Sequence, residues 1–142
     1  MPDERETVIP IESDADVVTA RQRARAMATE LELTSTDQTL LATAISEVAR
    51  NITTYATRGE VALSTIRNAN GRRGIRVVAQ DEGPGIENVE LALQDGYSSG
   101  DGLGLGLPGA RRLVHDFHIE TAPGQGTKVT LVMWERDNAR AA

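Results

Sequence analysis

The chain has 142 residues and a formal net charge of −6, and 39% of its residues are apolar, enough for one domain with its own core. It contains no cysteine, which excludes disulfides, thiolate zinc sites and a cysteine nucleophile, and its negative charge argues against nucleic-acid binding. No apolar run approaches a membrane span of about 20 residues, and the charged start is unlike a signal peptide, so we expect a soluble cytoplasmic protein without membrane contact.

The first predicted elements are a strand and a helix. Residues Thr7 to Glu12 are typical of a short strand. Ser13-Asp14 comes next and is able to cap a helix. The segment from Ala15 to Leu31 contains good helix formers and no Gly or Pro, which predicts a helix there.

A longer helix is predicted from about Thr36 to Tyr55. Ser35 followed by Gln38 fits a capping box at its start. Behind the box, apolar residues recur at helical spacing, as expected for a helix with one buried face. These residues are Leu41, Ile45, Val48 and Ile52.

Two strands and a short helix are predicted in the middle of the chain. Val61 to Ile66 and Ile75 to Gln80 are typical of strands, and Asn70-Gly71 between them is a turn signal. We therefore predict a hairpin with a loop longer than two residues. The segment from Asn88 to Leu93 is predicted as a short helix, whereas Gly96 to Leu105 is too rich in glycine for regular structure.

The last part of the chain predicts a helix and two strands. Pro108 is well placed in the first turn of the helix. Its apolar stripe consists of Leu107, Ala110, Leu113, Val114 and Phe117. His118 to Ala122 and Thr127 to Trp134 are predicted as strands around a Pro123-Gly124 turn.

This order of elements predicts a two-layer α+β sandwich with a mixed sheet and helices on one face. It lacks the strict strand–helix alternation of a Rossmann sheet. We expect a single domain over residues 1–142, with its core at about 7–134 and frayed ends.

Ten of the thirteen glycines lie between Gly71 and Gly109. Glycine in ordered structure costs entropy, so this clustering indicates either close backbone approach to a ligand or a mobile surface loop. Gly104, Gly106 and Gly109 form a literal G-x-G-x-x-G, but no strand directly precedes it, which excludes a Rossmann fingerprint. A phosphate site here would have to use backbone N–H groups and the start of the following helix.

Glu47 and Asn51 stand four residues apart on the long helix, at the edge of its apolar stripe. Asn51 offers a neutral oxygen for Mg²⁺, and Glu47 is able to orient or deprotonate a nucleophile. Arg50 lies beyond Glu47 on the exposed side. An isolated pair of this kind is more often a solvated helix face.

Asp81 ends the second strand of the predicted hairpin and is followed by Glu82-Gly83-Pro84-Gly85. A buried carboxylate at this point is able to accept a hydrogen bond from a purine amino group. The alternative is an ordinary turn aspartate, which is common.

The order and spacing of these segments resemble the nucleotide-binding boxes of the GHKL superfamily. E-V-A-R-N at 47–51, D-E-G-P-G-I at 81–86, G-D-G-L-G-L-G-L-P-G at 100–109 and G-T at 126–127 match its N, G1, G2 and G3 boxes. Members such as gyrase B and histidine kinases bind ATP on a two-layer sandwich, the Bergerat fold. From Thr7 to Trp134 the chain resembles the small anti-sigma-type serine/threonine kinases, and most of all the stressosome switch kinases.

The resemblance implies that the chain binds ATP and Mg²⁺. It implies that Glu47 is the general base, that Asn51 holds Mg²⁺, and that Asp81 binds the adenine amino group. The residues implied to lie beside the base are Gly83, Gly85 and Ile86, and Thr127 is implied to support Asp81 or a water beside the adenine. Those implied to form the lid and phosphate cradle are Gly100, Gly102, Leu103, Gly104, Leu105 and Gly106. Tyr97 to Leu107 contains no Lys or Arg, unlike the lid of some relatives, which makes Arg50 a candidate for contacting the γ-phosphate.

The function implied is a protein serine/threonine kinase acting on STAS-domain scaffold and sensor proteins of a stressosome. Once released, the kinase is expected to activate a downstream phosphatase or other output protein. The alternatives are an anti-sigma factor or nucleotide-dependent binding module of the same fold, acting without catalysis. A histidine-kinase fragment is disfavoured, because the two histidines, His115 and His118, are expected near the end of the late helix.

Overall fold

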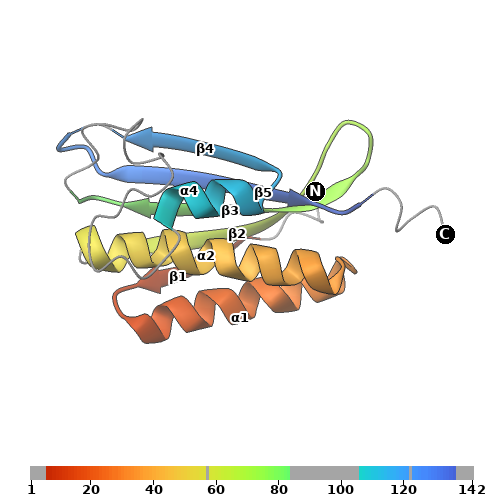
Figure 1. Cartoon of the computed structure of the whole chain (residues 1–142), viewed down its shortest axis with the longest axis horizontal. Coiled ribbons are helices and arrows are strands. Elements are labelled where there is room, and N and C mark those ends of the chain that lie inside the picture. Colours follow the sequence, from red (N-terminus) through yellow and green to blue (C-terminus); the bar gives the residue numbers. More distant parts are fainter. Residues whose placement is uncertain (1–5, 57, 84–105, 122, 137–142) are drawn as a thin grey trace.

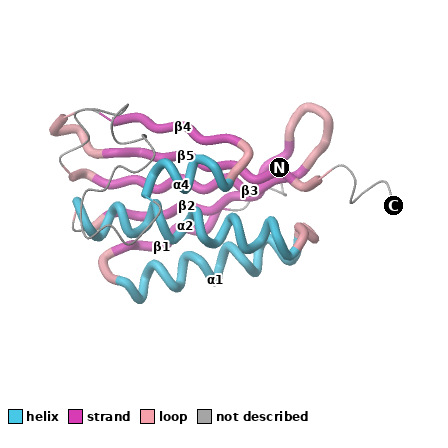
Figure 2. Tube along the Cα trace, viewed as in Figure 1, coloured by secondary structure: helices cyan, strands magenta, loops and turns pink. Residues whose placement is uncertain are grey.

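In the computed structural model, a layer of helices packs against one face of a five-stranded sheet (Figure 1, Figure 2). The structure describes residues 6–56, 58–83, 106–121 and 123–136. The strands lie in the order β1-β2-β3-β5-β4. In chain order the elements are β1 (Glu6–Ile11), α1 (Asp14–Glu30), α2 (Ser35–Tyr55), β2 (Gly59–Arg67), β3 (Arg73–Asp81), α4 (Gly106–Leu113), β4 (Asp116–Thr121) and β5 (Thr127–Trp134). The predicted α+β sandwich with helices on one face is confirmed.

The expectation of a mixed sheet is wrong, because every neighbouring pair of strands in the described residues is antiparallel. Two helices separate β1 from β2, so the chain runs back along α1 and forward along α2 before β2 returns antiparallel to β1. The strand β4 runs in the same direction as β3, but β5 lies between them. A parallel pair would require β4 beside β3, and β5 occupies that place.

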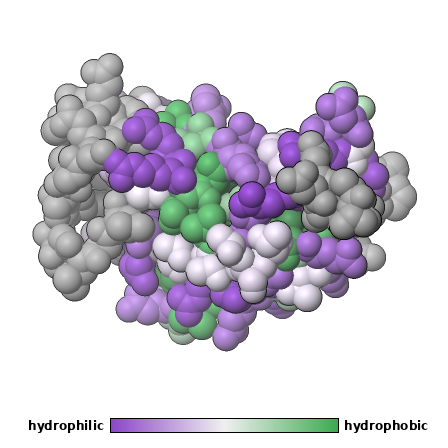
Figure 3. Space-filling view, turned by 45° about the vertical axis from the view of Figure 1, so that its right-hand side comes forward, coloured by the Kyte–Doolittle hydropathy of each residue, from purple (hydrophilic) through white to green (hydrophobic). Residues whose placement is uncertain are grey.

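The core lies between the helices and the sheet and is almost entirely aliphatic. Residues of β3 alternate as the two faces require: Ile75, Val77 and Ala79 are buried, whereas Arg76 and Gln80 are exposed. The predicted stripe of α2 is confirmed, since its members are at most 1% exposed: Leu41, Ile45, Val48 and Ile52. On the side shown in Figure 3, apolar surface lies between hydrophilic side chains, as expected where a core is only partly covered.

The start of α2 differs by one residue from the predicted capping box. Thr34 is the N-cap, and its hydroxyl accepts a 3.0 Å hydrogen bond from the Asp37 N–H. Gln38 does not reach back to the cap; its amide donates to the Leu33 carbonyl at 3.1 Å. Thr34 and Ser35 have equivalent capping chemistry, so the sequence pattern alone does not separate them.

The late helix is shorter than its apolar stripe suggests. α4 ends at Leu113, and Phe117 belongs to β4, which begins two residues earlier than predicted. His115 lies just after the end of α4, as expected, whereas His118 lies within β4 and not near the helix end. The predicted helix at Asn88 to Leu93 falls outside the described residues. No helix in the described ranges is long and apolar enough to cross a membrane.

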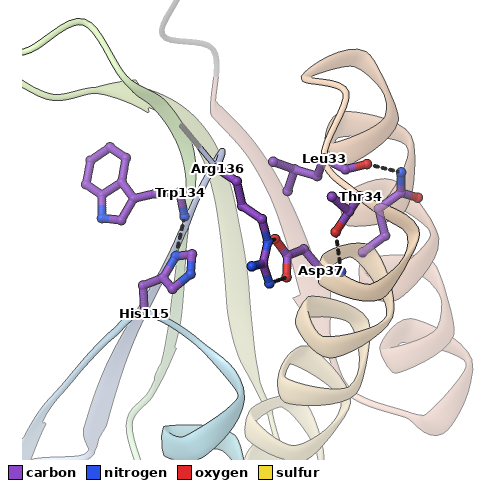
Figure 4. Close-up of polar contacts among 7 residues, drawn as sticks. Leu33, Thr34, Asp37, His115, Trp134 and Arg136 are labelled. Atoms are coloured by element: carbon purple, nitrogen blue, oxygen red, sulfur yellow. Dashed lines mark hydrogen bonds and ion pairs between the residues drawn. The ribbon is translucent and has the colours of Figure 1, made fainter. Parts of the chain in front are cut away.

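A charged clamp joins the end of β5 to the start of α2 (Figure 4). The Arg136 guanidinium donates to both carboxylate oxygens of Asp37, at 2.7 and 2.8 Å. The Asp37 side chain is only 2% exposed, whereas that of Arg136 is 52% exposed. The hydrogen bond from Arg136 lowers the pKa of Asp37 below its ordinary value, against the opposing effect of burial.

The neighbouring residue Trp134 is fixed by two hydrogen bonds. Its backbone N–H donates to His115 Nδ1 at 2.8 Å, and its indole Nε1–H donates to Asp116 at 2.9 Å. The indole also lies close against Gly74, where a Cβ atom would come within 2.7 Å of the ring. This end of the sheet is therefore held by polar contacts between segments far apart in the sequence.

We expect Asp37→Asn to lower the free energy of unfolding at pH 7 by about 1–2 kcal/mol. This value is near the lower end of the range for hydrogen bonds to charged groups, because Arg136 is half exposed and solvent weakens the interaction. Because the pKa of Asp37 is lower in the folded state, its ionised carboxylate stabilises the fold fully at pH values above the unfolded-state pKa of about 3.9. This stabilisation is lost as the pH falls through the folded-state pKa. The difference from wild type should therefore shrink at pH 3. Urea unfolding at both pH values measures it, with the exposed Asp14→Asn as control; a constant difference would contradict the clamp.

Candidate functional site

Asp81 is the last residue of β3, and this end of β3 lies on the left in Figure 1. It is 9% exposed and faces the helices, opposite Gly59 of β2 and Thr127 of β5. Its Oδ1 accepts a 2.8 Å hydrogen bond from the Gly83 N–H. Within the described residues, Oδ2 receives no hydrogen bond, so this oxygen is placed to accept one from a ligand.

Two glycines lie close to Asp81, one beside its carboxylate and one beside its backbone. At Gly83, an added Cβ would lie 2.7 Å from the Ala56 Cβ of α2 and 3.2 Å from Asp81 Oδ1. At Gly126, φ is +79°, and a Cβ would clash with the Asp81 carbonyl oxygen. Both positions therefore require glycine, and the chain closes tightly around Asp81.

A pair of threonines adjoins Asp81 on the same face of the sheet. Thr127 begins β5 and is 6% exposed, and Thr121 ends the edge strand β4 directly opposite it. Their hydroxyl oxygens are 3.0 Å apart, and the Thr121 hydroxyl also donates to the Gly126 carbonyl at 2.9 Å. The sequence motifs identified Thr127 but missed Thr121; its position across the Pro123-Gly124 turn was the available signal.

The predicted polar pair of α2 lies on the half of the helix that approaches Asp81. The Glu47 side chain is 10% exposed and forms a 3.3 Å ion pair with Arg50, whose side chain is 51% exposed. Asn51 is half-buried, about one turn before Ala56, which touches Gly83. The helix therefore carries Glu47 and Asn51 toward the end of the molecule that holds Asp81.

The start of α4 lies at this same end (Figure 1). Gly106 is its first residue, and the buried Leu107 and Ala110 pack the helix against the core. Free N–H groups and the positive end of the helix dipole make such a start favourable for an anion. Seven other predicted site residues lie outside the described ranges: Gly85, Ile86, Gly100, Gly102, Leu103, Gly104 and Leu105.

The described residues fit a purine nucleotide with its metal. Asp81 and Thr127 supply hydrogen-bond acceptors, and the start of α4 supplies donors. No group of three His, Asp or Glu side chains in the described ranges is able to hold a metal by itself. Mg²⁺ commonly takes only one or two protein ligands together with substrate phosphates, so a phosphate-borne Mg²⁺ does not require such a group.

Comparison with known sequences agrees with this geometry. A family profile described as a histidine kinase-like ATPase domain matches residues 11–133. The chain is 38% identical over 131 residues to the serine/threonine-protein kinase RsbT of Bacillus subtilis (strain 168), covering 92% of this chain and 98% of that protein. It is 29% identical over 118 residues to an anti-sigma F factor of Caldanaerobacter subterraneus subsp. tengcongensis, covering 81% and 82%.

Two solved structures share the fold. The first contains the RsbU and RsbW domains of Rv1364c from Mycobacterium tuberculosis, with a TM-score of 0.61 and 22% identity. It covers 94% of this chain, which spans only 33% of that protein. The second is the SiaB-SiaC complex from Pseudomonas aeruginosa, with a TM-score of 0.52 and 14% identity, covering 92% and 89%.

Proposed function

Since this chain belongs to the family of histidine kinase-like ATPase domains and is a serine/threonine kinase of the RsbT type, we propose that it transfers the γ-phosphate of Mg-ATP to STAS-domain proteins. The observation that carries the proposal is the convergence at one end of the molecule. The end of β3, which carries Asp81, the second half of α2, which carries Glu47 and Asn51, and the start of α4 all lie there. They provide a purine acceptor, a general base with a metal ligand, and an anion-binding helix start.

The proposed reaction uses these residues in distinct roles. Asp81 orients the adenine, Asn51 holds Mg²⁺, and the start of α4 binds phosphate oxygens. Glu47 accepts the proton as the serine or threonine oxygen of the partner bonds to the γ-phosphorus and the bond to the β-phosphate oxygen breaks, releasing ADP. Mg²⁺, when bound, stabilises the negative charge on the phosphates. Catalysis then rests chiefly on positioning and charge stabilisation.

The proposed substrates are the STAS-domain scaffold and sensor proteins of a stressosome. Phosphorylation of the scaffold releases the kinase, which then binds and activates a downstream phosphatase or another output protein. The resemblance of the motifs to stressosome switch kinases and the identity to RsbT support this assignment.

The decisive experiment is incubation with Mg-ATP and purified STAS-domain proteins, followed by mass spectrometry. A phosphoserine or phosphothreonine on the STAS domain, absent when Mg²⁺ is chelated, is the expected result. The likeness to an anti-sigma F factor favours one second candidate, a regulator that binds its partner in a nucleotide-dependent way without catalysis. Nucleotide-dependent complex formation with no phosphorylated product would support that candidate instead.

Asn51→Ala should remove the part of ATP affinity that depends on Mg²⁺ while adenosine binding is unchanged. The physical reason is that Asn51 contacts the metal and, through it, the phosphates, whereas adenosine has no phosphate. Calorimetric titrations with ATP, with and without Mg²⁺, and with adenosine measure both effects. Asn70→Ala, in the β2–β3 turn, is the control. If the variant keeps the full Mg²⁺ dependence, Asn51 is not the ligand.

A further inference from the structure

Three side chains form a row across the sheet at the proposed nucleotide end. Asp81 of β3 is opposite Thr127 of β5, and Thr127 is opposite Thr121 of β4. All three lie on the helix-covered face, where directly opposite residues have Cβ atoms about 5 Å apart. The outermost member, Thr121, has no role in the proposed reaction, although its hydroxyl contacts Thr127.

The direction of the hydrogen bonds in this row follows from the number of protons. A threonine hydroxyl carries one proton and two acceptor lone pairs, and a carbonyl oxygen only accepts. The 2.9 Å contact to the Gly126 carbonyl therefore uses the Thr121 proton. The 3.0 Å contact between the two hydroxyls then requires Thr127 to donate to Thr121.

Thr127 consequently has no proton left for a ligand and offers only lone pairs. Beside it, Asp81 Oδ1 is occupied by the Gly83 N–H, and a carboxylate is likewise an acceptor. The purine position next to this row meets two acceptors. An amino group satisfies them, whereas a carbonyl oxygen would face lone pairs and leave buried groups unpaired.

We infer that Thr121 is a positioning residue that sets purine specificity. By accepting the Thr127 proton, it holds the Thr127 hydroxyl as a hydrogen-bond acceptor, which favours a 6-amino purine over a 6-oxo purine. The inference rests on the proposed ATP site. Without Thr121 the Thr127 hydroxyl can rotate and donate, so a 6-oxo purine gains a partner.

The test compares three nucleotides, ATP, GTP and purine riboside triphosphate, which lacks the 6-substituent. Thr121→Val removes the hydroxyl and keeps the shape. We expect its affinity for ATP to fall about threefold to tenfold, as for loss of one neutral hydrogen bond. Affinity for purine riboside triphosphate should not change, and the ATP-to-GTP preference should narrow. Thr121→Ser should behave as wild type, and Thr130→Val on β5 is the matched control.

The inference would be overturned if Thr121→Val lost the same factor of affinity for all three nucleotides, because Thr121 would then only contribute packing. An unchanged ATP-to-GTP preference would also overturn it. If Thr121→Val fails to fold by circular dichroism, Thr121→Ala takes its place under the same criteria. The wild-type titration separates the two levels of the proposal. A wild-type chain that binds none of the nucleotides contradicts the proposed function, whereas wild-type ATP binding with an unselective effect of Thr121→Val contradicts this inference alone.

Discussion

Replacing Asp81 by asparagine should weaken ATP binding about tenfold to a hundredfold, the range expected when a hydrogen bond to a charged group is lost. The asparagine amide keeps the size of the side chain but replaces an acceptor with an N–H donor. That donor faces the adenine amino group, itself a donor, or displaces the contact with the Gly83 N–H. Equilibrium titration with ATP measures the change.

Two controls make the Asp81 result specific. Asp14→Asn alters an exposed aspartate in the first turn of α1 and should leave ATP affinity unchanged. The thermal unfolding midpoint of Asp81→Asn reports whether the buried strand end tolerates the substitution. Wild-type affinity in a folded Asp81→Asn variant would refute the position of the adenine.

The second large effect is expected at Glu47. Glu47→Gln should bind ATP nearly as well as wild type, yet its rate of phosphoryl transfer to a STAS partner should fall about a hundredfold or more, because a general base contributes a factor of this order. The amide keeps the size of the carboxylate but cannot accept the hydroxyl proton. Single-turnover transfer of labelled phosphate, measured with saturating ATP, separates chemistry from binding.

The matched control for Glu47 is Glu30→Gln, at the exposed end of α1. Arg50→Ala is informative as well, because Arg50 forms the 3.3 Å ion pair with Glu47. If Arg50 contacts the γ-phosphate, its loss should weaken ATP more than ADP. A normal transfer rate in Glu47→Gln would exclude Glu47 as the base.

The elements that the sequence predicted well are those with a local periodic signal. The α2 stripe from Leu41 to Ile52 and the β2–β3 hairpin around Asn70-Gly71 are examples, since spacing along the chain decides which face is buried. The boundary between α4 and β4 was misplaced, because the apolar residues from Leu113 to Phe117 suit a helix stripe as well as a strand. Tertiary packing decides that boundary.

Features that depend on distant segments were not predictable from local patterns. The insertion of β5 between β3 and β4 makes the sheet fully antiparallel, and strand order has no local signal. Asp37 and Arg136 are 99 residues apart in the chain, so their contact required the fold. In the candidate site, motif spacing predicts roles for Asp81 and Thr127, whereas Thr121 belongs to none of the motifs and only its hydrogen bonds in the fold connect it with them.

The hydrogen bonds and packing that hold Trp134 also make it an optical reporter. It is the only tryptophan of the chain, so fluorescence excited selectively at the tryptophan absorption comes from this one side chain. Trp134 pairs with Gly74 and Thr127 with Asp81, at opposite ends of the same strand ladder, about 24 Å apart at the usual rise per residue. A nucleotide at Asp81 is therefore too far away to contact the indole, so a change in the tryptophan emission on binding would report a structural change at the opposite end of this ladder.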